Sequence, residues 1–266
     1  MTSQVPPKGM SNLMLRVLVG VALIMVALAA VWFGGIPFWL LCVVLGVVMM
    51  GEWADLHATP PATKRLSQYA LSVPLAVMMP VLGVGPGFFA LGLLAGAAFF
   101  VVITTRRSGL ARGILYVGLP IMALLLIRRQ EEGVVFTIWA LALVWACDIG
   151  AYAAGRFIGG PKLAPTISPN KTWAGLAGGV LLASLLAALL HYRYGLALRL
   201  TLATPALAVL AQGGDLYESW LKRTAGVKDS GTVLPGHGGV LDRLDGLVPV
   251  APVAAVLVLL PKFYWW

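Results

Sequence analysis

Most aspartates of this 266-residue chain gather in two stretches of its C-terminal half, residues 145–175 and 212–247. Of the six aspartates in the chain, only Asp55 lies elsewhere. The clustered ones are Asp148, Asp215, Asp229, Asp242 and Asp245. Carboxylate oxygens are the ligands that Mg²⁺ prefers, and seven basic residues share these stretches. Acids and cations gathered in this way favour a hydrated polar site over separate ion pairs that only hold helices together.

The second stretch begins with side chains spaced for one face of a helix. Asp215, Glu218 and Ser219 are three and four positions apart, so a helix would align them. Lys222 and Arg223 follow one turn later, where the helix would leave the apolar layer. This spacing predicts a helix end that presents acids and cations together.

A glycine-rich loop follows at residues 226–239, and its GHGG run at 236–239 would let backbone N–H groups approach an anion closely. Beyond the loop, Asp242 and Asp245 are three positions apart and would share a face if the chain enters a helix again. Carboxylates for a metal ion, several cations and a glycine-rich turn together indicate a polyphosphate site.

Phosphoryl or nucleotidyl transfer suits such a site, because these reactions need chiefly positioning and neutralisation of charge. A phosphate-monoester nucleophile has its second pKa at about 6 and is largely ionised near neutral pH. A strong general base is therefore not required. For His237 we favour a role in ordering the loop or in hydrogen bonding a phosphate over a role as catalytic base.

The elements that carry these residues are expected to lie in a lipid bilayer. The chain is 60% hydrophobic, only 11% charged and has a mean hydropathy of +0.91, whereas a soluble domain carries about 25% charged residues. Asp148 and Asp215 fall inside apolar segments, where an ionisable side chain costs at least about 2.5 kcal/mol unless it is paired or hydrated.

The hydropathy pattern predicts an all-α, polytopic transmembrane protein. A span needs about 20 mainly apolar residues, and nine segments qualify. They run over about 13–33, 36–54, 69–84, 87–104, 111–128, 134–154, 174–192, 199–218 and 247–262. Residues 83–87 between the third and fourth spans fit either a tight turn or a re-entrant loop. We divide the chain into N-terminal membrane helices (1–135) and a C-terminal catalytic region with cytoplasmic loops (136–266).

The basic residues favour one orientation of these spans. With the N-terminus in the cytoplasm and the C-terminus outside, 14 of the 19 basic residues fall on the cytoplasmic side, as the positive-inside rule requires. Basic cytoplasmic loops therefore account for the net charge of +9, and nucleic-acid binding is not needed to explain it. Both polar stretches then face the cytoplasm.

The second stretch resembles the signature of the phosphatidate cytidylyltransferases, also called CDP-diacylglycerol synthases. That pattern is a Ser, then Lys-Arg, Lys-Asp, His-Gly-Gly and Asp-Arg-x-Asp at set spacings. The matching residues are Ser219, Lys222, Arg223, Lys228, Asp229, His237, Gly238, Gly239, Asp242, Arg243 and Asp245. More than ten specified positions within 27 residues make this a specific match.

The first stretch resembles the family less completely. The matching residues are Asp148, Ala151, Tyr152, Gly155, Arg156, Ile167, Ser168 and Pro169, followed by Lys171, Thr172, Trp173 and Gly175. Asn170 stands where the family usually has Lys, and Ala174 where it usually has Glu. The resemblance is good over about residues 140–250, and the N-terminal half agrees only as a set of apolar spans.

The resemblance implies a reaction in which CTP and phosphatidic acid give CDP-diacylglycerol and pyrophosphate, with Mg²⁺ as the required cofactor. It also implies a helical membrane protein, often a homodimer, whose polar cavity opens to the cytoplasm and to lipid. We accordingly expect a multi-pass protein of the inner (cytoplasmic) membrane.

The resemblance also implies roles for individual residues. Catalytic roles fall to Asp215, Lys222, Arg223, Lys228, Asp229, His237, Asp242, Arg243 and Asp245. Substrate binding falls to Ser168, Lys171, Thr172, Ser219, Gly238 and Gly239. The metal ligands are Asp215 and Asp242 first, then Asp245 and Asp229. Asp148 is either a further ligand or an acid that pairs with one of the cations.

Two alternatives remain open. Cytidylylation of another lipid phosphate, such as a polyprenyl or archaeal ether lipid, would use the same headgroup chemistry and the same motif. An ion-coupled transporter would explain intramembrane aspartates. It would leave the loop with the Lys-Asp, His-Gly-Gly and Asp-Arg-x-Asp pattern without a purpose. The CDP-alcohol phosphotransferases use a differently spaced run of aspartates and glycines, which the sequence lacks.

Overall fold

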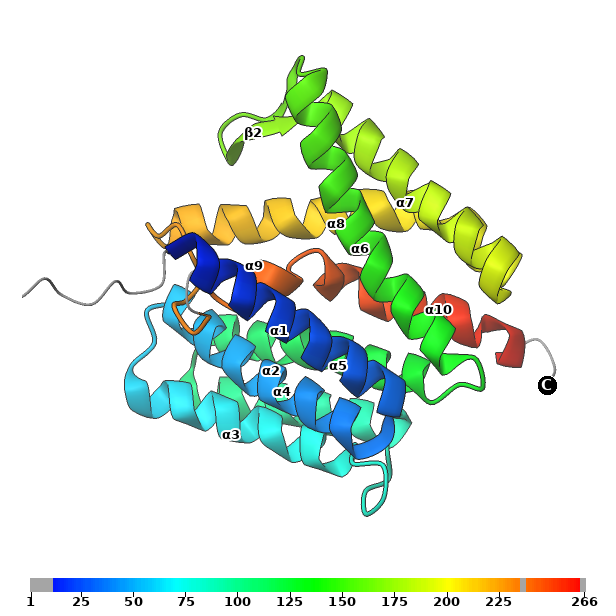
Figure 1. Cartoon of the computed structure of the whole chain (residues 1–266). Coiled ribbons are helices and arrows are strands. Elements are labelled where there is room, and N and C mark those ends of the chain that lie inside the picture. The colour runs from blue at the N-terminus through cyan, green and yellow to red at the C-terminus, as the bar shows by residue number, and fades with distance from the viewer. Residues whose placement is uncertain (1–11, 235–237, 264–266) are drawn as a thin grey trace, which may run out of the picture.

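The computed structural model describes residues 12–234 and 238–263, which form ten helices and one short β-hairpin (Figure 1). The first helices are α1 (Asn12–Phe33), α2 (Gly35–Leu56), α3 (Pro61–Val77), α4 (Phe88–Thr105), α5 (Ser108–Arg128) and α6 (Gly133–Phe157). Strands β1 (Lys162–Ala164) and β2 (Ser168–Thr172) follow, then α7 (Trp173–Tyr194), α8 (Leu198–Thr224), α9 (Leu241–Leu244) and α10 (Leu247–Phe263).

The hairpin is the one departure from the all-α prediction within the described residues. Strands β1 and β2 pair antiparallel, with Lys162 opposite Thr172 and Ala164 opposite Ser168. Both Ala164 and Ser168 precede a proline, and a residue before proline is disfavoured in the helical region of the backbone. The segment between α6 and α7 is therefore extended, and the prediction overlooked this local constraint.

Five helices, α2, α4, α5, α6 and α7, are long and apolar enough to cross a membrane. The apolar parts of α1 (Leu18–Phe33) and α10 (Leu247–Leu260) are shorter. Many large apolar side chains on these helices are exposed, as expected for surfaces that face lipid. The membrane character predicted from composition is thus supported, whereas the count of nine spans and their orientation stay predictions.

The third predicted span, 69–84, is wrong in its position. Helix α3 begins eight residues earlier, at Pro61, and ends at Val77. Proline favours the first turn of a helix because its missing N–H has no partner to lose there. Residues 79–87 form the connection to α4, with Gly85 at φ +81°. This segment is a loop between two helices.

Helices α2 to α5 pack side by side, and α10 lies against α5 and α8 (Figure 1). Their core includes the fully buried side chains of Trp53, Leu71, Leu94 and Ile114. The indole Nε1 of Trp53 donates to the backbone oxygen of Gly109 at 2.9 Å, which ties α2 to the start of α5. This packed part of the molecule carries the polar end of α2.

Helices α6 and α7 form a closely packed pair that crosses α8 and carries the hairpin at its end (Figure 1). Glycines permit the close approach. A Cβ added to Gly178 would lie 2.3 Å from Ala154 Cβ, and one added to Gly150 would lie 2.5 Å from the backbone oxygen of Gly178. Small residues at such contacts let membrane helices approach backbone to backbone. The pair thereby holds Asp148 of α6 opposite the start of α7.

Candidate active site

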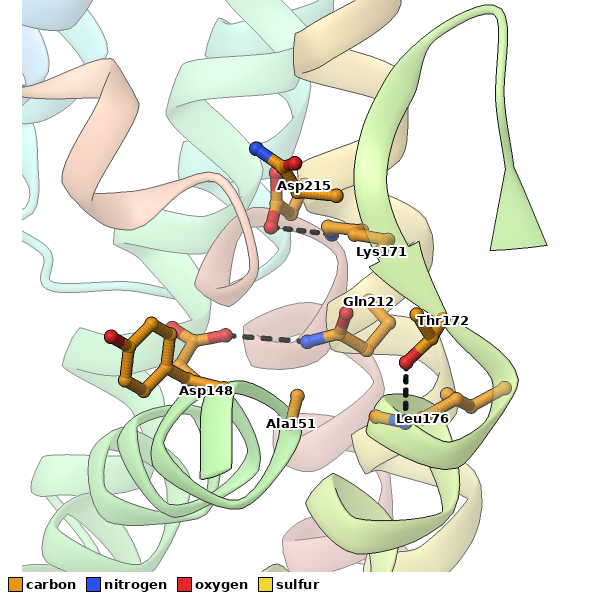
Figure 2. A pocket seen from close by; sticks show the side chains of 10 residues that line it. Asp148, Ala151, Lys171, Thr172, Leu176, Gln212 and Asp215 are labelled. Carbon is orange, nitrogen blue, oxygen red and sulfur yellow. Dashed lines mark hydrogen bonds and ion pairs between the residues drawn. The ribbon is translucent and has the colours of Figure 1, made fainter. Parts of the chain in front are cut away.

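A polar cavity of about 270 Å³ lies where α6, the hairpin with the start of α7, and α8 meet (Figure 2). Its lining combines acids, a lysine and amides with a few apolar side chains. The lining residues are Asp148, Ala151, Tyr152, Asn170, Lys171, Thr172, Gly175, Leu176, Gln212 and Asp215. The structure thus joins both polar stretches of the sequence in one cavity.

An ion pair between Lys171 and Asp215 spans the cavity. Lys171 is on β2 and Asp215 on α8, and Nζ lies 2.5 Å from Oδ2 (Figure 2). Both side chains are mostly buried, with exposed fractions of 17% and 30%. Ser219, one turn further along α8, donates its hydroxyl to Asp215 Oδ1 at 3.4 Å. Asp215 therefore contacts both the expected lysine and the expected serine.

Asp148 is held from α8 by a residue that the sequence analysis did not select. The amide Nε2 of Gln212 donates to Asp148 Oδ1 at 3.3 Å and lies 3.7 Å from the Cys147 sulfur (Figure 2). Gln212 is a polar residue within an apolar helix, three positions before Asp215. The sequence could have pointed to Gln212, because a residue three positions before Asp215 lies on the same face of the helix as Asp215.

Thr172 has a structural role at the start of α7. Its hydroxyl accepts a hydrogen bond from the backbone N–H of Gly175 at 3.0 Å and so caps the helix. Thr172 is nearly fully buried, although it contributes to the cavity lining. Ser168, at the other end of β2, is half-buried and pairs with Ala164 in the hairpin.

Asp242 forms the centre of a second cluster, on α9. Lys222 Nζ donates to its Oδ1 at 2.6 Å, and the backbone N–H groups of Ser230 and Gly239 donate to its Oδ2 at 2.9 and 2.8 Å. Burial alone would raise the pKa of this carboxyl, but the Lys222 ammonium and the two N–H donors stabilise the charged form more. The pKa of Asp242 is therefore lower than its ordinary value.

Two further carboxyls, Glu218 and Asp245, lie beside this cluster. Glu218 on α8 is fully buried, and Lys222 Nζ lies 3.6 Å from its Oε1. Burial and the nearby Asp215 carboxylate raise the pKa of Asp245 to about 6, while the Glu218 carboxyl and the backbone N–H of Gly246 oppose that rise. Three acids thus lie around Lys222, and Glu218 joins Asp242 and Asp245, which were expected there.

The glycine-rich loop uses its N–H groups differently from the expectation. The Gly239 N–H, predicted to face a substrate phosphate, holds the carboxylate of Asp242. Gly238 has φ +83°, and a Cβ there would lie 3.0 Å from Asp242 Oδ2, so both glycines permit the loop to fold over Asp242. His237 lies outside the described residues.

The remaining predicted site residues are exposed around these clusters. They are Arg223 at the end of α8, Lys228 and Asp229 on the loop, and Arg243 on α9. Asp229 directly precedes Ser230 and is exposed, and a Cβ added to Gly238 would lie 3.7 Å from its Cγ.

Mg²⁺ suits the chemistry of these clusters. Both Glu218 oxygens are buried without a hydrogen-bond donor, and oxygen ligands are what this ion prefers. In the described part of the chain, however, no three acidic, histidine or cysteine side chains come together tightly enough to hold a metal ion by themselves. Mg²⁺ is commonly bound by one or two carboxylates together with substrate phosphates, and that arrangement matches the residues present.

Fold and site together are those of a helical membrane protein with a site of lysines and carboxylates, side chains whose chemistry suits a phosphorylated substrate. The model of the cytidylyltransferase family matches residues 14–260, so the chain belongs to that family.

Similar proteins include the phosphatidate cytidylyltransferase of Brucella suis biovar 1 (strain 1330), 40% identical over 91% of this chain and 92% of that protein. The phosphatidate cytidylyltransferase of Rickettsia felis is 29% identical over 92% of each chain. That of Staphylococcus saprophyticus is 43% identical over 55% of this chain and 56% of its own.

Proposed function

We propose that this protein transfers a cytidylyl group from CTP to phosphatidic acid and releases pyrophosphate, giving CDP-diacylglycerol for phospholipid biosynthesis. The observation that carries the proposal is 40% identity to a phosphatidate cytidylyltransferase over 91% of the chain. The cavity that joins Lys171 to Asp215 supports it, because the two polar stretches form one site on a scaffold of apolar helices.

In this reaction a phosphate oxygen of phosphatidic acid attacks the α-phosphorus of CTP. The new P–O bond forms as the bond to the β-phosphate oxygen breaks, and pyrophosphate leaves with the electron pair. The attacking phosphate is largely ionised near neutral pH, so none of the carboxylates needs to remove a proton. The work of the site is positioning and charge neutralisation.

Lysines and arginines would neutralise the phosphates. Lys171 and Lys222 are mostly buried and paired with Asp215 and Asp242, so a phosphate or metal ion that enters would exchange partners with them. Arg223, Lys228 and Arg243 are exposed nearby and suit the outer phosphates of CTP and the lipid headgroup. Ser219 would orient Asp215 through their hydrogen bond.

We assign Mg²⁺ to Asp215 and Asp242, with Asp245 and Asp229 as further ligands. When bound, the ion neutralises charge on the triphosphate and on the departing pyrophosphate. Glu218 is a buried acid whose ion pair in the described residues is with Lys222, and burial disfavours the charged form of Asp245. A divalent ion would stabilise both carboxylates. Asp148, held by Gln212 across the cavity, would orient the entering substrate.

The finer features of the membrane arrangement belong to the same proposal. We infer nine spans in the inner (cytoplasmic) membrane, the N-terminus and site on the cytoplasmic side, and a homodimer. The concentration of basic residues in the loops beside the site supports this orientation. Phosphatidic acid would then reach the cavity from the bilayer and CTP from the cytoplasm.

A direct test measures pyrophosphate release by purified protein in mixed micelles. Release should require CTP, phosphatidic acid and Mg²⁺ together. Asp215→Asn should lower the rate at least about 100-fold, because it removes a charge that positions both the metal ion and Lys171. Asp55→Asn is the matched control, since Asp55 pairs with Lys64 at the surface. Faster turnover with a polyprenyl phosphate than with phosphatidic acid would instead favour the alternative lipid substrate.

A further inference from the structure

Glu52, on α2 in the N-terminal half, is a buried carboxylate attached to the glycine-rich loop. Its exposed fraction is 3%. Its Oε1 accepts the backbone N–H of Val240 at 2.9 Å, and its Oε2 accepts the backbone N–H of Leu241 at 2.7 Å and the Ser230 hydroxyl at 3.2 Å. These donors are 178 to 189 positions away in the sequence.

The loop is shaped around this carboxylate by two glycines. A Cβ added to Gly231 would lie 2.7 Å from Glu52 Oε1. One added to Gly239 would lie 2.8 Å from Glu52 Oε2 and 2.1 Å from the Ser230 hydroxyl oxygen. Contacts this short would displace either the loop or the carboxylate. Glycine at both positions therefore leaves the room that the Glu52 carboxylate occupies.

The same loop segments hold Asp242 on their other side. Ser230 gives its hydroxyl to Glu52 and its backbone N–H to Asp242. Gly239 gives its N–H to Asp242, and the next two N–H groups go to Glu52. Ser230 and residues 239–241 therefore lie between two carboxylates. A shift at Glu52 would move the N–H donors that set the position of Asp242.

Glu52 is not part of the cavity lining, and it takes no part in the ion pairs of Lys64, Lys171 and Lys222. Its charge is instead balanced by three neutral donors. Buried carboxylates are stable only when hydrogen-bonded, and an N–H left without its acceptor after truncation would bear the full cost of desolvation. Glu52 acts on the site only through the loop.

We propose that Glu52 is a positioning residue for the transfer reaction, which holds loop residues 230–231 and 239–241 so that Asp242 and Lys222 keep the geometry needed for turnover. The expected change in kcat rests on the proposed function, because it is measured for cytidylyl transfer. The N-terminal half of the chain, which contains none of the expected site residues, thereby contributes directly to the order of the site.

The test compares Glu52→Gln with Glu131→Gln, a change at an exposed glutamate between α5 and α6. Glutamine keeps the shape but replaces one acceptor oxygen with a donor. Per folded enzyme, Glu52→Gln should lower kcat about 10- to 100-fold, the scale expected for a displacement of about 1 Å. KM for CTP should stay within about threefold, because Lys171 and the cavity lining do not contact Glu52. Glu131→Gln should match wild type.

Hydrogen exchange of the peptide spanning residues 227–241 gives a readout independent of activity. The amides of Val240 and Leu241 should exchange at least about tenfold faster in Glu52→Gln than in wild type, because they lose an acceptor. An inactive wild type with this exchange difference would refute the proposed reaction while leaving Glu52 as the residue that holds the loop. Wild-type exchange, or an unchanged kcat in an active enzyme, would overturn the inference.

Ser230→Ala decides the question if Glu52→Gln does not fold. It removes the hydroxyl bond to Glu52 and leaves the backbone bond to Asp242 in place. We expect kcat per folded enzyme to fall about two- to tenfold, in proportion to one lost hydrogen bond, with faster exchange over residues 227–241. Unchanged kcat and exchange in this variant would overturn the inference.

Discussion

At the residue scale, the site is organised by lysines that stand between acids. Lys171 pairs with Asp215, and Lys222 pairs with Asp242 and lies near Glu218. Removal of one partner from a buried pair leaves a charge uncompensated, which costs far more than loss of an exposed pair. The lysines therefore stabilise the buried carboxylates, and we propose that they also supply the cations that a phosphate requires.

Lys171→Met tests this dual role. The substitution keeps the length of the side chain but leaves Asp215 without its cation, so kcat/KM for CTP should fall about 30-fold or more. Lys64→Met, which breaks the exposed pair with Asp55, should stay within about twofold. Steady-state kinetics on both purified variants checks the prediction, and an equal effect of the two substitutions would contradict it.

Asp245 makes the stability of the metal-free protein depend on pH. Its folded-state pKa is raised from 3.8 to about 6, chiefly by burial. The folded state therefore binds a proton more tightly than the unfolded state, and this contribution to stability is present below about pH 4 and lost as pH rises through 6. With chelator present, the thermal midpoint of wild type should include a component that decreases between pH 4.5 and 7.

Asp245→Asn should remove that component and flatten the pH dependence, whereas Asp55→Asn should keep the wild-type profile. Thermal unfolding monitored at several pH values in one detergent provides the measurement. A wild-type slope that survives Asp245→Asn would show that another group titrates in this range.

At the scale of elements, close packing of α6 against α7 positions Asp148 and β2. Gly178→Ala would bring a methyl group within 2.3 Å of Ala154 Cβ and 2.9 Å of the Gly150 oxygen. Overpacking of this kind costs about 1–3 kcal/mol, so the thermal midpoint should fall by several degrees. Gly92→Ala on α4, where a Cβ meets nothing within 4 Å, is the matched control and should not lower it.

Sequence reasoning found the site acids and lysines because their types are unusual in an apolar chain and their spacings align them on helices. It could not identify which residues that are far apart in the sequence contact one another. Glu52 and Gln212 are single polar residues in apolar segments, and only the packing of α2 and α8 shows what they hold. The hairpin was overlooked because hydropathy dominates in a membrane chain and conceals local proline constraints.

At the scale of the whole molecule, the proposed function places the site on the cytoplasmic side of the membrane. Thr224→Cys, at the exposed end of α8, should react with a membrane-impermeant maleimide only after cells are permeabilised. Glu131→Cys, in the loop between α5 and α6, should react in intact cells. The native Cys42 and Cys147 are buried and serve as the background. Labelling of Thr224→Cys in intact cells would reverse the proposed orientation.

Transfer of a cytidylyl group to a lipid phosphate sends the α- and γ-phosphates of CTP to different products, so labelled CTP distinguishes it from other reactions. Purified protein is incubated with phosphatidic acid, Mg²⁺ and CTP labelled in either the α- or the γ-phosphate, and label in the lipid fraction is measured. We predict that the α-label enters the lipid and that the γ-label stays in the aqueous phase as pyrophosphate. Transfer of the γ-label to lipid, or of neither label, would contradict the proposed cytidylyl transfer.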